Sequence, residues 1–264
     1  MTTVEPYDII AFNTARESEN KMHDDTVAQK FGFAGGLVPG VDVYAYMTRA
    51  PLLQFGEEFL QRGVMSARFL KPVYDGEKTT VASELEDGHL RLSAVSRGDL
   101  CATGEAFLGS APTPKLTDYE AVDLVAERSP ADEETLKVGR LLGIAPVTIT
   151  AESLAAYLGD IRETETIYAS QGLCHPGFYT RLFNWALKNN VVLGPWIHVS
   201  SATDHFAAAR VGDTLSVRAR VADNYDRKGH RFVDLDGIVV ANGERVIARV
   251  HHSAIYRPRQ LVAA

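Results

Sequence analysis

The sequence lacks the features of a secreted, membrane-bound or disulfide-stabilised protein. It contains only two cysteines, Cys101 and Cys174, and two thiols cannot make the disulfide framework of a small secreted domain. No run of about 18 apolar residues predicts a transmembrane helix. The first residues also lack the basic and apolar regions of a secretory signal. We therefore expect a cytoplasmic protein with no membrane partner.

Charge and short motifs exclude further classes of function. Lysine and arginine number 27 against 34 aspartate and glutamate, which gives a net charge of −7, so we expect no nucleic-acid partner. No Gly-x-Ser-x-Gly element indicates a serine hydrolase. Because no Cys-x-x-Cys pair occurs and the histidines lack the spacing of metal ligands, we expect no metal site.

The chain contains a partial internal repeat. Its 264 residues would suit one domain or two. Pro39-Gly40 and Pro176-Gly177 each open a predicted helix, and the two pairs lie 137 residues apart. Downstream, Gly76 and Gly212 each precede a strand pattern and lie 136 residues apart. This nearly constant offset indicates that one structural unit was duplicated.

Each copy reads as one helix followed by antiparallel strands. Apolar residues recur at helical spacing over residues 178–187, and the equivalent helix covers residues 41–47, with Pro51 expected to end or kink it. Short turn signals separate the strand patterns, which is typical of an antiparallel sheet. The predicted strands are residues 64–70, 78–85, 89–96 and 102–108, and residues 198–206, 214–222, 232–241 and 245–256.

These patterns predict an α+β fold with residues 1–112 and 147–264 as the two copies and residues 113–146 as a helical connector. A capping-box match at Thr117 and Glu120 predicts a helix through Glu127, and Ser129-Pro130 restarts the chain before a second helix through Leu142. We expect the copies to join edge to edge in one continuous sheet, like a dimer fused into one chain. We also expect the whole chain to form a homodimer.

One segment carries the most specific motif. Residues 18–28 read Ser-Glu-Asn-Lys-Met-His-Asp-Asp-Thr-Val-Ala, and GFAGGLVPGV follows soon after. This segment resembles the site motif of the MaoC-like acyl-thioester hydratase/dehydratase family, which runs Asp-x-Asn-Pro-hydrophobic-His, then an alanine-containing helix, then a His-Gly element. The matching positions are Asn20, Met22, His23, Ala28 and Gly40. The resemblance implies a double hot-dog fold, in which two helix-wrapped antiparallel sheets join as a pseudo-dimer.

The sequence departs from that pattern at functional positions. The catalytic Asp of the family falls on Ser18, and the His before the helix glycine is replaced by Pro39. In the second copy, Asp160 matches the acidic position, but Glu165 stands where the His belongs. Neither copy therefore holds an intact Asp/His pair.

The resemblance implies an acid/base site in the first copy. Adding water to an enoyl thioester needs a proton acceptor and a proton donor, and a neutral histidine suits both tasks near pH 7. We predict that His23 is the general base and acid, that Asn20 orients it or the water, and that the amide of Gly40 binds the thioester oxygen. Glu19 is our candidate for the missing carboxylate. Asp24 and Asp25 are open alternatives, although both also suit the cap and first turn of a helix over residues 26–31.

We expect further substrate-binding residues at Tyr44, Asp160, His175 and Gly177. Three of them have a structural alternative. Tyr44 also suits a packed core, Asp160 a loop after a helix, and His175 the start of a helix. His23 could likewise bond only to nearby backbone, and Asn20 could hold a turn.

The predicted function is hydration or dehydration of an α,β-unsaturated acyl thioester. The altered motif leaves three alternatives: isomerisation, cyclisation or conjugate addition on a biosynthetic intermediate; a non-catalytic acyl-group binding module; or a thioesterase. We expect a small-molecule or acyl-thioester partner. No cofactor is expected apart from the coenzyme A or acyl-carrier thioester that a substrate would bring.

Overall fold

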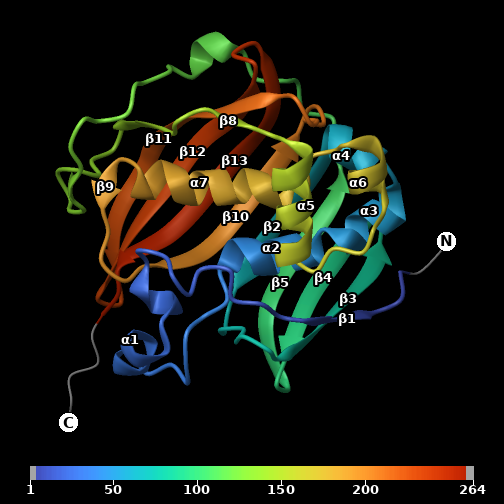
Figure 1. Cartoon of the computed structure of the whole chain (residues 1–264), viewed down its shortest axis with the longest axis horizontal. Coiled ribbons are helices and arrows are strands. Elements are labelled where there is room, and N and C mark those ends of the chain that lie inside the picture. The colour runs from blue at the N-terminus through green and yellow to red at the C-terminus, as the bar shows by residue number, and fades with distance from the viewer. Residues whose placement is uncertain (1–3, 260–264) are drawn as a thin grey trace.

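The two copies share one curved antiparallel sheet. In the computed structural model, which describes residues 4–259, eleven strands pair in the order β1-β3-β4-β5-β2-β10-β13-β12-β11-β7, with β8 also paired to β11. Two helices, α2 and α7, lie across one face of this sheet (Figure 1). Each half is thus a sheet that wraps one helix, which is the double hot-dog arrangement. No helix of residues 4–259 is long and apolar enough to cross a membrane.

The strands of the first half are β1 (Tyr7–Ile10), β2 (Gly63–Phe69), β3 (Lys78–Glu86), β4 (His89–Ser96) and β5 (Asp99–Leu108). Those of the second half are β10 (Ile197–His205), β11 (Thr214–Arg227), β12 (His230–Ala241) and β13 (Arg245–Arg257). Four short strands belong to the connector region and the loop after α7: β6 (Ser129–Pro130), β7 (Leu141–Gly143), β8 (Val147–Thr148) and β9 (Val191–Val192).

The helices are α1 (Asp25–Lys30), α2 (Gly40–Met47), α3 (Arg49–Phe55), α4 (Glu58–Arg62), α5 (Ala151–Asp160), α6 (Ile167–Gln171) and α7 (Gly177–Lys188). Two 3-10 turns, η1 (Lys21–His23) and η2 (Leu116–Asp118), complete the secondary structure of residues 4–259. The break between α2 and α3 falls at Thr48. Because Pro51 lacks an amide proton, it cannot continue the hydrogen-bond pattern of α2, and the predicted kink is confirmed.

The halves join through β2 and β10. These strands pair antiparallel from Arg68 opposite Ser200 to Val64 opposite Asp204, so the predicted continuous sheet is confirmed. Between the helices, Asp42 of α2 accepts a hydrogen bond of 2.8 Å from Arg181 of α7. Asp42 is wholly buried, and this ion pair ties the two halves together beneath the sheet.

All eight predicted strands occur, and most ends differ by only a few residues. The largest difference is β11, which runs to Arg227 because β12 pairs with it as far as His230. Sequence patterns did not predict β1, which is only four residues long and lies at the sheet edge beside β3. Nor did they predict β7 and β8, which lie at the other edge on β11.

The connector is not helical, and this prediction was wrong. Between residues 113 and 146 the described structure contains one 3-10 turn, η2, and otherwise short strands and turns. Tyr119 is buried on a small apolar cluster with Ile238, Val240 and Val246 of the second half. The chain extends along the outer face of the sheet to make this contact, so tertiary packing overrides the local capping box.

The second predicted connector helix is replaced by pairing and a single turn. Ser129-Pro130 pairs in parallel with Val191 and Val192 after α7. The Asp132 carboxylate accepts hydrogen bonds from the amides of Glu134 and Thr135 and thereby caps one turn. The chain leaves that turn through Gly139, whose φ of 85° favours glycine, and then pairs as β7 with β11.

Candidate active site

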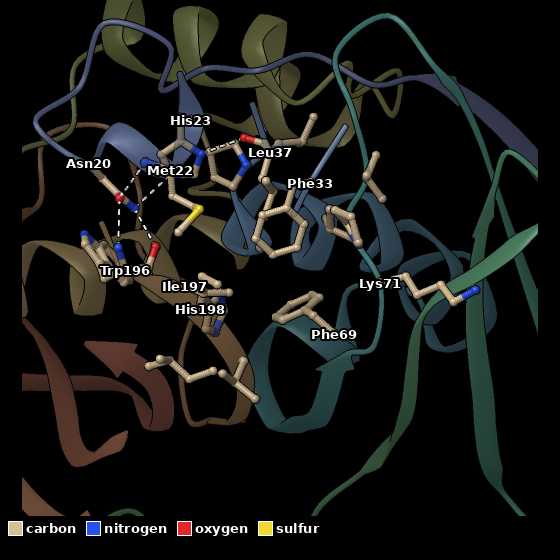
Figure 2. A pocket seen from close by; sticks show the side chains of 18 of the residues that line it. Asn20, Met22, His23, Phe33, Leu37, Phe69, Lys71, Trp196, Ile197 and His198 are labelled. Carbon is tan, nitrogen blue, oxygen red and sulfur yellow. Dashed lines mark hydrogen bonds between the residues drawn. The ribbon is translucent and has the colours of Figure 1, made fainter. Parts of the chain in front are cut away.

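A largely apolar pocket opens where the motif segment meets the second half. We call it the inner pocket; its volume is about 270 Å³. Asn20, Met22 and His23 approach it from one side, and Ile197 and His198 of β10 from another (Figure 2). The apolar side chains that line it are Met22, Phe33, Leu37, Val38, Val43, Phe69, Leu70, Val73, Ile197, Val199 and Ile255. Such a lining suits an acyl chain or another apolar group.

The local sequence explains how Asn20 and His23 come to share this pocket. Asn20 is the N-cap of η1, and its side-chain oxygen accepts a hydrogen bond of 3.2 Å from the amide of Met22. Met22 is 1% exposed and anchors the turn in a cluster with Ala28 and Leu37. One turn of 3-10 helix then brings residues three apart to the same side.

His23 is fixed in a single neutral tautomer. Its Nδ1 lies 2.6 Å from the carbonyl oxygen of Leu37, which can only accept a hydrogen bond, so Nδ1 carries the proton. Its Nε2 lies 3.1 Å from the amide nitrogen of Asn20, which donates. Two independent neighbours therefore leave the lone pair on Nε2.

The orientation of the Asn20 amide follows from the backbone of the second half. Its oxygen accepts from the amide of Trp196 at 3.1 Å, and its nitrogen donates to the carbonyl of Trp196 at 3.0 Å. These two contacts exclude a flipped amide. The residue that orients His23 is thus itself held by the other half of the chain.

The electrostatic surroundings keep His23 uncharged. Burial lowers the pKa of His23 below that of a free imidazole, although the hydrogen bond to Leu37 and the charge of Asp42 act in the opposite direction. Protonation at Nε2 would also set an N–H against the donor of Asn20. Asn20 therefore favours the neutral base, and an imidazolium formed here would release its proton readily.

Gly40 begins α2 at the wall of the inner pocket. The first amides of a helix carry the positive end of its dipole; here the amides of Asp42 and Val43 donate to the carbonyl of Pro39, whereas that of Gly40 precedes this pattern. A Cβ at this position would lie 2.8 Å from Nδ1 of His198, so only glycine lets the ring and the helix approach so closely. The predicted oxygen-binding position thus lies in the same pocket as His23.

Ser18 and Glu19 do not line the inner pocket. They line a second, outer pocket of about 430 Å³ that shares Asn20 and His23 with the inner one. The Glu19 carboxylate is bound by Arg128 of the connector at 2.9 Å, and its side chain is 71% exposed. The structure therefore directs this candidate carboxylate toward Arg128, and its role as the missing acid stays a prediction.

Asp24 and Asp25 take structural positions. The Asp24 carboxylate accepts from the amide of Val27 at 3.0 Å and caps α1. The Asp25 carboxylate accepts from the amide of Gly36 at 2.7 Å. Asp24 and Asp25 thus have the structural roles that were the alternative to supplying the missing carboxylate.

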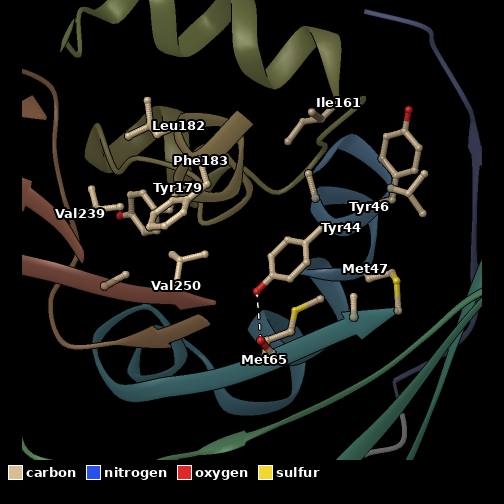
Figure 3. Packing of buried hydrophobic residues seen from close by; sticks show 14 of the residues in the cluster. Tyr44, Tyr46, Met47, Met65, Ile161, Tyr179, Leu182, Phe183, Val239 and Val250 are labelled. Atoms are coloured by element: carbon tan, nitrogen blue, oxygen red, sulfur yellow. Dashed lines mark hydrogen bonds between the residues drawn. The ribbon is translucent and has the colours of Figure 1, made fainter. Parts of the chain in front are cut away.

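Tyr44, predicted to bind substrate, lies in the core instead. Its side chain is fully buried, and its hydroxyl donates to the carbonyl of Met65 at 3.3 Å (Figure 3). The inner pocket is lined by Val43 and not by Tyr44. Tyr44 follows Val43 in α2, so its side chain points in a different direction, toward the sheet. The prediction that Tyr44 binds substrate was therefore wrong.

His175 and Gly177, also predicted to bind substrate, are closed off by helix packing. His175 is fully buried; its Nδ1 accepts from the amide of Gly177 at 3.0 Å, and its Nε2 lies 3.3 Å from Glu163. A Cβ on Gly177 would lie 2.5 Å from the Cβ of Ala45. Both positions therefore serve the contact between α7 and α2, where no room for a substrate remains.

Asp160 lies apart from these two residues. Its carboxylate is 3.4 Å from the guanidinium of Arg181 and lines a separate pocket of about 230 Å³. Of the predicted site residues, the structure thus brings Asn20, His23 and Gly40 together at the inner pocket. Within residues 4–259, no cluster of three or more His, Cys, Asp or Glu side chains is arranged to hold a metal ion.

Sequence reasoning missed several residues of the inner pocket. Asn184 of α7 and Trp196 and His198 of the second half all line it. Trp196 and His198 lie more than 150 residues from the motif along the chain, so no local spacing links them to it. Only the repeat, which predicts that the halves pack together, pointed toward a shared site.

Known proteins resemble this chain in fold rather than in sequence. No family model matches the sequence, and no curated protein matches it. Among solved structures, Rv0216, a conserved Mycobacterium tuberculosis protein with a double hotdog fold, is 16% identical with a TM-score of 0.62, covering 97% of this chain and 96% of its own. A protein assigned as a MaoC domain dehydratase from Chloroflexus aurantiacus is 13% identical with a TM-score of 0.62, covering 97% and 94%.

A thioesterase is similar at a lower level. An acyl-ACP thioesterase from Bacteroides thetaiotaomicron is 12% identical, with a TM-score of 0.50, and the match covers 95% of this chain and 97% of the other. These likenesses establish the double hot-dog fold. Because that fold carries dehydratases and thioesterases alike, the reaction must be argued from the site itself.

Proposed function

We propose that the protein hydrates an α,β-unsaturated acyl thioester, or runs the reverse dehydration, with His23 as the acid/base group. The observation that carries this proposal is the neutral tautomer of His23, whose Nε2 lone pair is held at the wall of an apolar pocket. The acyl chain occupies the inner pocket. The thioester carbonyl lies at the start of α2, whose first-turn amides stabilise negative charge on its oxygen.

In the dehydration direction, a β-hydroxyacyl thioester loses a proton from Cα to Nε2 of His23. The electron pair forms an enolate whose charge rests on the thioester oxygen. The Cα–Cβ double bond then forms as the β-hydroxyl leaves with the proton that Nε2 returns, which gives enoyl thioester and water and restores neutral His23. The substrate proton replaces the hydrogen bond of Asn20, which retains its contacts with Trp196.

In this mechanism His23 alone transfers the proton in both steps, whereas the family motif contains both an Asp and a His. Among the described residues that line the inner pocket, none is Asp or Glu. His23 must therefore both take and return the proton, which requires the α-proton and the β-hydroxyl to lie on the same face of the substrate. Syn stereochemistry is the expected consequence.

A second candidate, double-bond isomerisation, is favoured by the same missing carboxylate. A single base can take a proton from Cα of a 3-enoyl thioester and return it to Cγ without any leaving group. The pocket and the carbonyl site serve both reactions equally. The two reactions differ in whether water enters the product.

Crotonyl-CoA separates these possibilities. Loss of its conjugated absorbance without thiol release indicates hydration, and free thiol indicates a thioesterase. Vinylacetyl-CoA, a 3-enoyl thioester, reports isomerisation by gain of the same absorbance. We expect His23→Ala to reduce hydration by about 10²- to 10⁴-fold, whereas His89→Ala, which alters an exposed histidine on β4, leaves it unchanged. A native protein inactive on both thioesters would refute the proposal.

A further inference from the structure

Three side chains on the inner face of the sheet form a hydrogen-bonded chain that ends at the inner pocket. Nε2 of His198 lies 2.8 Å from the hydroxyl of Ser201, and that hydroxyl lies 2.9 Å from Nδ1 of His252. The two rings are stacked, with centroids 4.2 Å apart. We call these three residues the His-Ser-His chain. His198 lines the inner pocket, so the chain connects that pocket to the core.

Both outer ends of the chain lack partners. Nδ1 of His198 and Nε2 of His252 are buried without a hydrogen bond to any described residue. His198 is 6% exposed, and its Nδ1 faces Gly40 at the start of α2. His252 is 1% exposed and packs near the ring of Phe183 in the core. One end therefore faces the pocket wall and the other faces apolar side chains.

Both rings are neutral. Burial lowers the pKa of His198 to about 3, and burial together with the neighbouring His198 lowers the pKa of His252 well below its ordinary value. Each ring thus carries one proton, and the Ser201 hydroxyl has one proton to donate. If Ser201 donates to His252, His252 carries its proton on Nε2. If Ser201 donates to His198, His198 carries its proton on Nδ1.

The surroundings of the two outer ring nitrogens favour one of these two protonation states. The first places an N–H of His252 in the apolar core with no acceptor, which is unfavourable because a buried donor loses its hydrogen bond to water and gains none in return. The second places an N–H of His198 beside Gly40 at the wall of the inner pocket. The second state leaves only a lone pair in the core, and unsatisfied buried acceptors are tolerated better than unsatisfied N–H groups.

We propose that His198 donates its Nδ1–H to the carbonyl oxygen of the bound thioester, with Ser201 and His252 fixing the tautomer that makes this possible. His198 then acts beside the first-turn amides of α2, so that two kinds of donor meet at one oxygen. His23 moves protons, whereas His198 stabilises the enolate and stays neutral. The inference rests on the proposed function for its substrate, but the tautomer is a property of the free protein.

The tautomer is measured first, without any ligand. In ¹⁵N-labelled full-length protein at pH 7, long-range ¹H–¹⁵N spectra distinguish protonated from unprotonated ring nitrogens. We expect protonated Nδ1 and unprotonated Nε2 on both His198 and His252. A protonated Nε2 on His198 overturns the inference, whatever reaction the protein catalyses.

Carbonyl polarisation is measured next. In a His23→Ala background, which we expect to bind thioesters without turning them over, bound cinnamoyl-pantetheine should absorb at longer wavelength than it does in water. We expect His198→Phe to abolish this shift, and His198→Asn, which retains a donor near the Nδ1 position, to keep part of it. Ser201→Ala should weaken the shift and Ser201→Thr should preserve it. A full red shift in His198→Phe overturns the inference.

Kinetics separate failure of the inference from failure of the proposed function. We expect His198→Phe to lower kcat for hydration of crotonyl-CoA by about 10²- to 10³-fold with little change in KM, as for loss of one oxyanion donor. His205→Phe is the matched control, because His205 is equally buried but does not line the inner pocket. Native turnover that His198→Phe leaves intact contradicts only the role of His198. Absence of native turnover contradicts the proposed function, and the spectra still decide the tautomer.

Discussion

Asn20 and Trp196 are joined by two hydrogen bonds although they lie 176 residues apart in the chain. The Asn20 amide donates to and accepts from the backbone of Trp196, and the same amide holds Nε2 of His23. The second half thus orients the amide that faces Nε2 of a histidine in the first half. The proposed acid/base site therefore depends on both copies of the duplicated fold.

The pH dependence of activity should report the neutral state of His23. Because burial lowers its pKa, the base stays deprotonated as the pH falls past 6.5, and we expect the acid limb of kcat/KM to have its midpoint below the ordinary imidazole value of about 6.5. Asn20→Asp replaces the donor facing Nε2 with a carboxylate, which raises the pKa of His23 and moves the limb to higher pH. Asn20→Ala is the uncharged control. A midpoint above 6.5 in the native protein would contradict this assignment.

Restoring the carboxylate of the family motif should increase hydration. Ser18 falls on the position of the catalytic Asp and lines the outer pocket together with His23. We expect Ser18→Asp to raise kcat on crotonyl-CoA by about tenfold, since a second acid/base group relieves His23 of one proton transfer. Ser18→Asn has nearly the same shape without the charge. If both variants respond alike, the missing carboxylate does not limit the rate.

The ion pair between Asp42 and Arg181 should be necessary for stability. Asp42 is fully buried and Arg181 is mostly buried, with 17% of its side chain exposed. Removing one partner leaves an uncompensated charge, and we expect Arg181→Met to cost about 3–5 kcal/mol in the free energy of unfolding. The double variant Asp42→Leu/Arg181→Met should recover most of this loss. Urea unfolding measures both, and equal losses in the single and double variants would argue against coupling.

Buried histidines should make the protein sensitive to acid. Burial lowers the pKa of His205 to about 3, and both its ring nitrogens lack partners among the described residues. The unfolded chain binds a proton near pH 6.5 and the folded chain does not, so stability is full above that pH and falls as the pH drops toward 3. We expect His205→Phe to reduce this loss by up to roughly 3 kcal/mol at pH 4. Unfolding curves of the native protein and His205→Phe at pH 7 and pH 4 test this prediction. If both proteins lose the same free energy of unfolding between the two pH values, the prediction is contradicted.

The sequence was sufficient to predict the architecture because local residue patterns indicate the strands and the turns between them. Turn residues such as Gly76 and Gly212 mark the strand ends, and apolar alternation marks the strands. The prediction of a helical connector was wrong because Tyr119 packs on the outer face of the second half. A local capping signal contains no information about such a distant contact.

The site was predictable only in part, for a geometric reason. His198 and Ser201 are three residues apart in a strand, and strict alternation places them on opposite faces. A bulge between His198 and Ser200 shifts the phase, so that both side chains turn inward toward His252. No single-sequence pattern shows that bulge. Asn20 and His23 were predicted because both match the family motif within a short segment, and in the structure a single 3-10 turn holds them together.

The most direct test of the account is solvent deuterium at Cα. Crotonyl-CoA is incubated in D₂O with the native protein, and the 3-hydroxyacyl product is examined by NMR. We predict one deuterium at Cα, delivered to the same face as the hydroxyl, and little product with His23→Ala. Deuterium delivered to the face opposite the hydroxyl, or hydration that persists in His23→Ala, would contradict the claim that His23 moves the proton.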